Sequence, residues 1–225
     1  MRSRARAAIL LALVLGSPAV APAADPAPPA IWHIDLHSFR PVEGPSSGPQ
    51  VYYHIVENPE GPILRGVYYP GMETVTMGVE IPERLRARVR QVSWRWRARA
   101  FPVGGDECRG GRGDSAASVS LAFKSGLKWY ILKYVWSSVG PLGAVCDRKR
   151  TLLLARDTIV LESGGKAGVW LPEAVDVRQA FIDHFEGGNP RASVPDLVGI
   201  GLMTDGDQTH SESSADWADF EVQYE

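Results

Sequence analysis

The sequence has 225 residues, a formal net charge of −2 at pH 7 and only two cysteines. Without an excess of basic residues, general attraction to nucleic acid is disfavoured. After the N-terminal segment, no stretch approaches the roughly 18 uninterrupted apolar residues of a membrane span. The length suits one domain with a sizeable core.

The N-terminal segment has the three parts of a signal peptide. Arg2, Arg4 and Arg6 form a positive region, residues 7–16 form an apolar run, and Ala21-Pro22-Ala23 supplies the small residues that signal peptidase recognises. We expect cleavage after Ala23, which leaves a disordered Pro/Ala tether at 24–30 and a single domain at 31–225. Removing three of the 24 basic residues leaves 21 against 26 acidic ones, a net charge of −5. The mature protein would be periplasmic or secreted.

The two cysteines, Cys108 and Cys146, predict a disulfide in an oxidising compartment. Both lie beside glycine-rich turns, so the bond would join two loop regions. Closing a loop of this length would stabilise the fold by about 4 kcal/mol in the chain-entropy estimate.

Short segments with period-2 alternation run through the chain and predict strands. They cover residues 31–39, 51–56, 63–69, 73–81, 91–101, 117–124, 128–137, 197–204 and 217–223. Their regular spacing is typical of an all-β protein, an antiparallel two-sheet sandwich of jelly-roll or lectin-like form. Residues 150–155 and 158–162 predict a hairpin with Arg156-Asp157 at its turn. Between Pro172 and Phe185 the period changes, and we expect one short helix that caps the sandwich.

One predicted strand places three arginines on the same face. In residues 91–101 the even positions are apolar, so Arg95, Arg97 and Arg99 share the opposite side. Such a row could bind carboxylates or sulfates of a polymer, because guanidinium groups pair with them bidentately. Alternatively, the arginines pair with neighbouring acidic residues on an exposed face.

An aromatic row follows on another predicted strand. Residues 128–137 place Tyr130, Tyr134 and Trp136 on one face, beside the small polar face of 117–124. Aromatic rings on a sheet with free space above it could stack against sugar rings. Alternatively, the rings are core residues, because both faces of this strand are apolar.

The loop between the last two predicted strands contains Asp205 and Asp207, with a glycine between them. Two carboxylates in a loop could ligate Ca²⁺, although a recognisable 12-residue calcium loop is absent. The alternative is a turn in which the aspartates satisfy loop amides, with no cofactor.

Several segments together resemble a family of exported bacterial proteins catalogued as domain of unknown function 3047. They are Arg65 to Met77, Trp94-Arg95-Trp96, Gly113-Asp114, Tyr134-Val135-Trp136-Ser137, Trp170 with Glu173, and Gly199-Ile200 through Thr204 to Thr209. The resemblance implies a β-sandwich related in shape to jelly-roll carbohydrate-binding modules and lectin-like enzymes, without an established activity. The chain departs from the family pattern at Ser115, Ser118, Val175 and Ala180, where members tend to carry charged residues.

The sequence therefore predicts an exported protein that binds a carbohydrate or another envelope polymer on one sheet face. The expected ligand-binding residues are Arg95, Arg97, Tyr130, Tyr134 and Trp136. One alternative is an enzyme in the same cleft: a polysaccharide lyase using Arg95 and Tyr134, or a glycoside hydrolase with two carboxylates across the groove. Another is a structural envelope protein without a small ligand. No serine nucleophile elbow, zinc motif, phosphate loop or dinucleotide fingerprint is present.

Overall fold

A computed structural model describes residues 29–42 and 51–225 of the protein. The expected signal peptide, residues 1–23, lies outside the described residues, as does most of the tether at 24–30. Within the described ranges, no helix has both the length and the apolar character that crossing a membrane requires.

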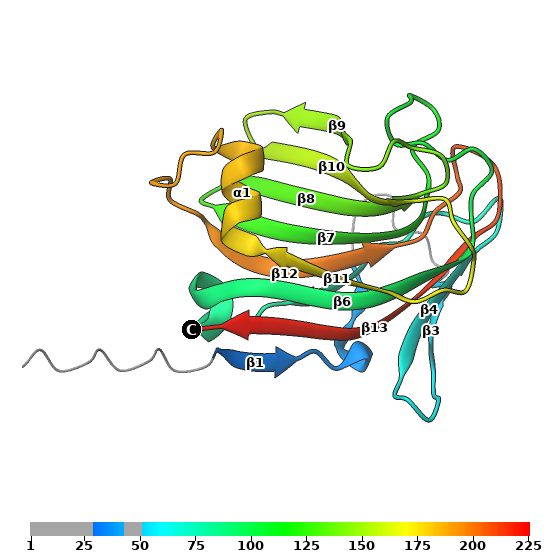
Figure 1. Cartoon of the computed structure of the whole chain (residues 1–225), viewed down its shortest axis with the longest axis horizontal. Coiled ribbons are helices and arrows are strands. Elements are labelled where there is room, and N and C mark those ends of the chain that lie inside the picture. Colours follow the sequence, from blue (N-terminus) through cyan, green and yellow to red (C-terminus); the bar gives the residue numbers. More distant parts are fainter. Residues whose placement is uncertain (1–28, 43–50) are drawn as a thin grey trace, which may run out of the picture.

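In this part of the chain, thirteen strands form two sheets that pack face to face, named here sheet A and sheet B (Figure 1). Sheet A has the order β11-β6-β13-β4-β3, and β1 also pairs with β13. Its strands are β1 (Ala30–His33), β3 (Tyr53–Val56), β4 (Ile63–Tyr68), β6 (Val89–Ala100), β11 (Leu171–Asp176) and β13 (Ser213–Tyr224). Sheet B has the order β2-β5-β12-β7-β8-β10-β9. Its strands are β2 (Arg40–Pro41), β5 (Met77–Glu80), β7 (Ser115–Ser125), β8 (Lys128–Ser137), β9 (Val145–Arg150), β10 (Leu154–Ser163) and β12 (Asp196–Met203). The expected all-β sandwich is confirmed.

One strand pair differs from the antiparallel expectation. β10 is parallel to β8 and antiparallel to β9, because the chain leaves β8, forms the edge strand β9 and then returns between them. The predicted turn at Arg156-Asp157 is wrong, since both residues lie inside β10 and the reversal falls at residues 151–153. Asp157 is buried there because Arg150 pairs with it at 2.7 Å and His184 at 2.9 Å.

Aromatic residues from both sheets form the centre of the core. Trp94 and Trp96 of β6 face Tyr134 and Trp136 of β8, with ring centroids 6.1 Å apart in the first pair and 5.9 Å in the second. All four are buried, as alternation along each strand requires for the inward face. Truncating one of the tryptophans to alanine would cost about 3–5 kcal/mol.

The short capping helix is present as α1 (Val177–Phe185), at the left end of the sandwich in Figure 1. It begins later than expected: residues 171–176 form β11, and Asp176 caps the helix by accepting a hydrogen bond from the Gln179 amide at 2.7 Å. Phe181 anchors the helix in the core. Two short 3₁₀ helices, Leu36–Ser38 and Glu83–Arg88, complete the described elements.

Candidate functional site

The five residues predicted to bind ligand do not share a surface. Arg95 and Arg97 project from the outer face of sheet A, opposite to the buried tryptophans of β6. Tyr134 and Trp136 project from sheet B into the core, where they are 5 % and 2 % exposed. Tyr130 is half-buried beneath α1. Core packing therefore explains the aromatic row, because the inward face of β8 meets sheet A and leaves no room for a sugar.

The same separation removes the residue pair expected for a lyase. Burial raises the pKa of the Tyr134 hydroxyl well above its ordinary value, which makes it a poor base. Arg95 lies on the far side of sheet A and cannot act on the same substrate atom as Tyr134.

The arginine row of β6 is paired with carboxylates of β13. The Asp216 carboxylate of β13 has no exposed side-chain area. The guanidinium groups around it belong to Arg65, Arg97 and Arg99. Burial raises the pKa of Asp216, but hydrogen bonds from Arg65 and Arg97 outweigh this effect and hold it below the ordinary value. Arg95 pairs with Asp219 in turn. Pairing with neighbouring acids, the second interpretation of this row, is what the structure contains.

The outer face of sheet B carries an open groove of about 920 Å³, named here the sheet-B groove. Its floor is low because β5, β7 and β12 present small residues outward at this point. These residues are Gly78, Ser120, Ala122, Gly199 and Gly201. The small face of residues 117–124 therefore does leave room above the sheet, but on the side away from the aromatic row.

An exposed tryptophan stands beside this floor. Trp129 of β8 lines the groove and is 39 % exposed. The Lys124 ammonium lies 4.8 Å from the centroid of its ring, a cation–π distance that helps to fix the ring in place. Trp129 occupies the face of β8 opposite to Tyr130, Tyr134 and Trp136.

A charged pocket of about 450 Å³ lies on the same sheet as the groove. Its charged lining residues are Glu107, Arg109, Lys133, Asp147, Lys149, Arg156 and Asp205. One row of cross-strand partners joins the two cavities, running Gly78, Gly201, Ser120, Lys133, Thr158 across five strands. The first three residues line the groove and the last two line the pocket. At ~4.8 Å per strand the row is about 19 Å long, so the groove and the pocket lie in line across sheet B and are together named the track.

Two buried carboxyl groups lie at the pocket. Glu107 is 7 % exposed, and neither of its oxygens has a hydrogen-bond partner within the described chain. Burial raises its pKa; the Ser137 and Ser115 hydroxyls and the Lys133 ammonium lie close enough to limit the rise, but no hydroxyl meets hydrogen-bond geometry. Burial also raises the pKa of Asp205 to about 7, although Lys133 and the Ser115 amide stabilise its charged form. Both groups can therefore hold a proton more readily than an exposed carboxylate.

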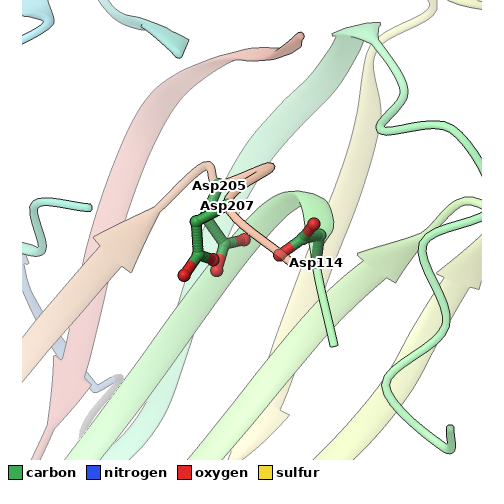
Figure 2. Close-up of side chains that lie close together, drawn as sticks. All are labelled: Asp114, Asp205 and Asp207. Atoms are coloured by element: carbon green, nitrogen blue, oxygen red, sulfur yellow. The ribbon is translucent and has the colours of Figure 1, made fainter. Parts of the chain in front are cut away.

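Asp205 also belongs to a cluster of three aspartates. Carboxylate oxygens of Asp114, Asp205 and Asp207 all lie within 4.8 Å of one another. Figure 2 shows Asp205 and Asp207 side by side on the loop after β12, with Asp114 facing them from the segment before β7. Oxygen ligands at this spacing could hold a Ca²⁺ ion. They could instead share a proton, since burial and then Asp114 raise the pKa of Asp207.

Asp114 accepts hydrogen bonds from amides of the loop that follows β12, the role that the turn alternative expected of Asp205 and Asp207. Its oxygens accept hydrogen bonds from the amides of Gln208 at 3.2 Å and Thr209 at 2.6 Å, and from the Thr209 hydroxyl at 2.6 Å. Three donors already use much of its acceptor capacity. The calcium interpretation of Asp205 and Asp207 stays a prediction.

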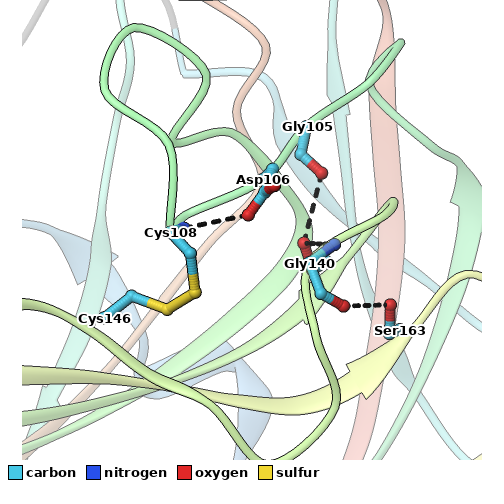
Figure 3. The surroundings of a disulfide bond; sticks show 7 residues. Gly105, Asp106, Cys108, Gly140, Cys146 and Ser163 are labelled. Atoms are coloured by element: carbon cyan, nitrogen blue, oxygen red, sulfur yellow. Dashed lines mark hydrogen bonds between the residues drawn. A yellow bond between two sulfur atoms is a disulfide. The ribbon is translucent and has the colours of Figure 1, made fainter.

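The predicted disulfide between Cys108 and Cys146 is present and lies at the charged pocket (Figure 3). The Cys108 amide donates to Asp106 at 3.0 Å, which shapes the loop that carries Glu107. Cys146 lies on β9, next to the pocket residue Asp147. The bond therefore joins two walls of the pocket.

Sequence reasoning missed the residues that line this track. Trp129 and Lys133 alternate with the aromatic row, so the pattern contained them, but it did not indicate which face of β8 meets the other sheet. Glu107 lies in an irregular loop where no periodicity applies. Only its position beside Cys108 could have indicated that it is fixed in place.

Comparison with solved structures gives neighbours of low similarity. A family 11 carbohydrate-binding module from Clostridium thermocellum, in complex with a mixed-linked tetrasaccharide, has a TM-score of 0.44 at 11% identity and covers 88% of this chain and 96% of its own. The xyloglucanase domain of a type three effector from Sinorhizobium fredii, in complex with cellobiose, has a TM-score of 0.44 at 10% identity, with 88% and 97% covered. The Trichoderma harzianum endoglucanase 3 from family GH12 has a TM-score of 0.36 at 9% identity, with 88% and 98% covered. TM-scores this low carry no inference about what the chain binds.

Comparison with curated protein sequences found no match. A family model described as "Protein of unknown function (DUF3047)" matches residues 73–221. The match covers more than half of the chain and includes β6, β7, β8 and the Asp205–Asp207 loop.

Proposed function

The chain belongs to the DUF3047 family, and we propose that it binds polysaccharide in the sheet-B groove. The observation that carries this proposal is the open cavity of about 920 Å³ over a floor of glycine, serine and alanine, with the Trp129 ring beside it. Sugar rings offer apolar faces and polar edges, so a low floor and an exposed aromatic ring are suited to them. We also propose that the protein is exported by its N-terminal segment, with which the disulfide is compatible.

The length of the track favours a polymer over a small molecule. The groove is open, and the charged pocket lies in line with it along a row that crosses five strands. Small-molecule sites bury most of their ligand, whereas this surface is a long, shallow cleft. A chain of sugars lying across the strands would contact both cavities at once.

The proposal is tested with the mature protein and a panel of bacterial and plant polysaccharides, by affinity electrophoresis followed by calorimetry on polymers that retard the protein. We expect Trp129→Ala to weaken binding on the order of tenfold through loss of the stacking surface. Tyr69→Ala is the matched control, because Tyr69 is 49 % exposed and lies outside the groove. Equal effects of the two variants, or no retardation by any polymer, would contradict the proposal.

A second variant separates binding from folding. A Cβ atom added at Gly201 would lie 3.4 Å from the Thr76 methyl, close to an ordinary contact, and it would rise from the groove floor. Gly201→Val should therefore leave the unfolding midpoint nearly unchanged and obstruct the polymer. If this variant binds the polymer as tightly as the wild type, the polymer does not bind over Gly201 in the groove.

A second candidate function is glycoside hydrolysis in the same track. It is favoured by Glu107 and Asp205, two buried carboxyl groups with raised pKa values at one pocket. One protonated group would donate to the glycosidic oxygen while the other, ionised, would take a proton from the attacking water. New reducing ends during incubation, lost in both Glu107→Gln and Asp205→Asn, would support catalysis. If the protein is retained on the polysaccharide and no new reducing ends form, the protein binds this polymer without cleaving it.

A further inference from the structure

Basic residues on the outer face of sheet A form ion pairs, whereas, in the described part of the chain, the lysines on the outer face of sheet B do not. On sheet A, Arg95, Arg97 and Arg99 of β6 each have an ion-pair partner, either Asp216 or Asp219. On sheet B, no carboxylate among the described residues lies within ion-pair distance of Lys124, Lys133 or Lys149. These three ammonium groups therefore lie on the face that carries the groove, without a direct ion pair to any described residue.

The acidic residues along the track do not cancel this charge. Glu80 at the groove is paired with Arg86 at 3.4 Å, and Asp147 at the pocket is paired with Arg156. The other two acids, Glu107 and Asp205, are buried at 7 % and 5 % exposure. A ligand entering the track would thus meet ammonium groups first, on a protein whose whole chain is net negative at −2.

The position of Lys133 connects this charge to the proposed polymer. Lys133 is the cross-strand partner of Ser120 on the groove floor and lines the charged pocket. It shares the outward face of β8 with Trp129, four residues away, or about 13 Å along the strand. One polymer could therefore cover the Trp129 ring and reach the Lys133 ammonium.

We propose that the ligand of the sheet-B groove is an acidic polysaccharide, whose carboxylate or sulfate groups bind Lys133 and Lys149 in the charged pocket. This inference rests on the proposed function and adds the chemical class of the polymer. Ammonium groups pair with such anions as point charges, so they recognise charge without demanding one geometry. The predicted recognition of polymer anions is thereby moved from Arg95 and Arg97 of sheet A to the lysines of sheet B.

The test compares polymers that differ only in charge. Polygalacturonate is set against its fully methyl-esterified form, and dextran sulfate against dextran, so that the two arms distinguish carboxylate from sulfate. We expect the charged member of at least one pair to bind about tenfold tighter, with an affinity that falls as salt rises. Lys133→Gln with Lys149→Gln should remove about tenfold of that affinity, while Lys166→Gln, an exposed lysine outside both cavities, should not.

The outcomes separate this inference from the proposal beneath it. Binding of neutral polymers that depends on Trp129 and is indifferent to the lysine variants would overturn the acidic ligand and leave the groove function standing. Equal losses in the Lys133/Lys149 and Lys166 variants would show general charge attraction and also overturn it. Failure of every polymer to bind would overturn both.

Discussion

Arg65 holds Asp216 by both of its carboxylate oxygens: Nε lies 2.6 Å from Oδ1 and a terminal nitrogen lies 3.0 Å from Oδ2. Arg65 is on β4 and Asp216 on β13, and Arg97 of β6 also donates to Oδ2 at 2.7 Å. The buried carboxylate thereby joins three adjacent strands of sheet A. With the pair of Arg95 and Asp219, each arginine of the row on β6 has an ion-pair partner.

Removing this carboxylate should strongly destabilise the protein. We expect Asp216→Asn to lower the free energy of unfolding by about 3–5 kcal/mol, because the arginines lose their partner in a buried site. Asp219→Asn, at the half-exposed pair with Arg95, should cost no more than about 1 kcal/mol. Urea unfolding measures both, and equal costs would mean that burial of Asp216 adds nothing.

Reduction of the disulfide should weaken the fold by about 4 kcal/mol, since the unfolded chain regains the freedom of a closed loop. Cys108 and Cys146 are 38 residues apart. Cys108→Ser and Cys146→Ser should each match the reduced wild type in chemical unfolding. A variant that kept the oxidised stability would contradict the expected role of the bond.

Stability should fall as the pH rises from about 4.5 to about 7 through the effect of Glu173. Burial raises the pKa of this carboxyl to about 7, against a hydrogen bond from Trp96, and Glu162 adds to the rise. In this window the folded state binds more protons than the unfolded state, so each increase in pH favours unfolding. Glu173→Gln should reduce the difference in unfolding free energy between pH 5 and pH 8 by on the order of 1–2 kcal/mol. An unchanged difference would assign the pH dependence to other groups, among them Asp205.

The aspartate cluster gives a test of the calcium prediction. The three hydrogen bonds to Asp114 occupy acceptor positions that an ion would need, so we expect equal melting midpoints with calcium and with chelator at pH 7. Asp207→Asn should then raise the midpoint, because it removes one of three crowded carboxylates. A higher midpoint in calcium that disappears in Asp207→Asn would instead support a bound ion, since a ligand of the native state stabilises it.

Alternation predicted the strands well where one face is apolar and the other polar. β8 has the predicted bounds, and β6, β7, β12 and β13 lie within a few residues of theirs. The turn of the hairpin after β8 was misplaced, because the charged pair Arg156-Asp157 resembles a turn. Asp157 is tolerated inside β10 because Arg150 and the distant His184 pair with it. Local patterns carry no information about such partners.

The site was harder to predict than the strands. Period-2 patterns separate the two faces of a strand but do not say which face meets the second sheet, and β8 is apolar on both. The pattern therefore predicts Tyr134 and Trp136 as ligand-binding rings, whereas the structure buries both and exposes Trp129 on the other face. The sequence also does not predict the ion pair between Arg65 and Asp216, because the two residues lie 151 positions apart.

The covalent link between Cys108 and Cys146 has a consequence for when the protein can act. Its two half-cystines are chain neighbours of Glu107 and Asp147, on facing walls of the charged pocket. While the thiols are reduced, no covalent bond joins these walls. The proposed binding of a ligand in the pocket would then depend on oxidation of the two thiols, which links it to the redox state of the surroundings.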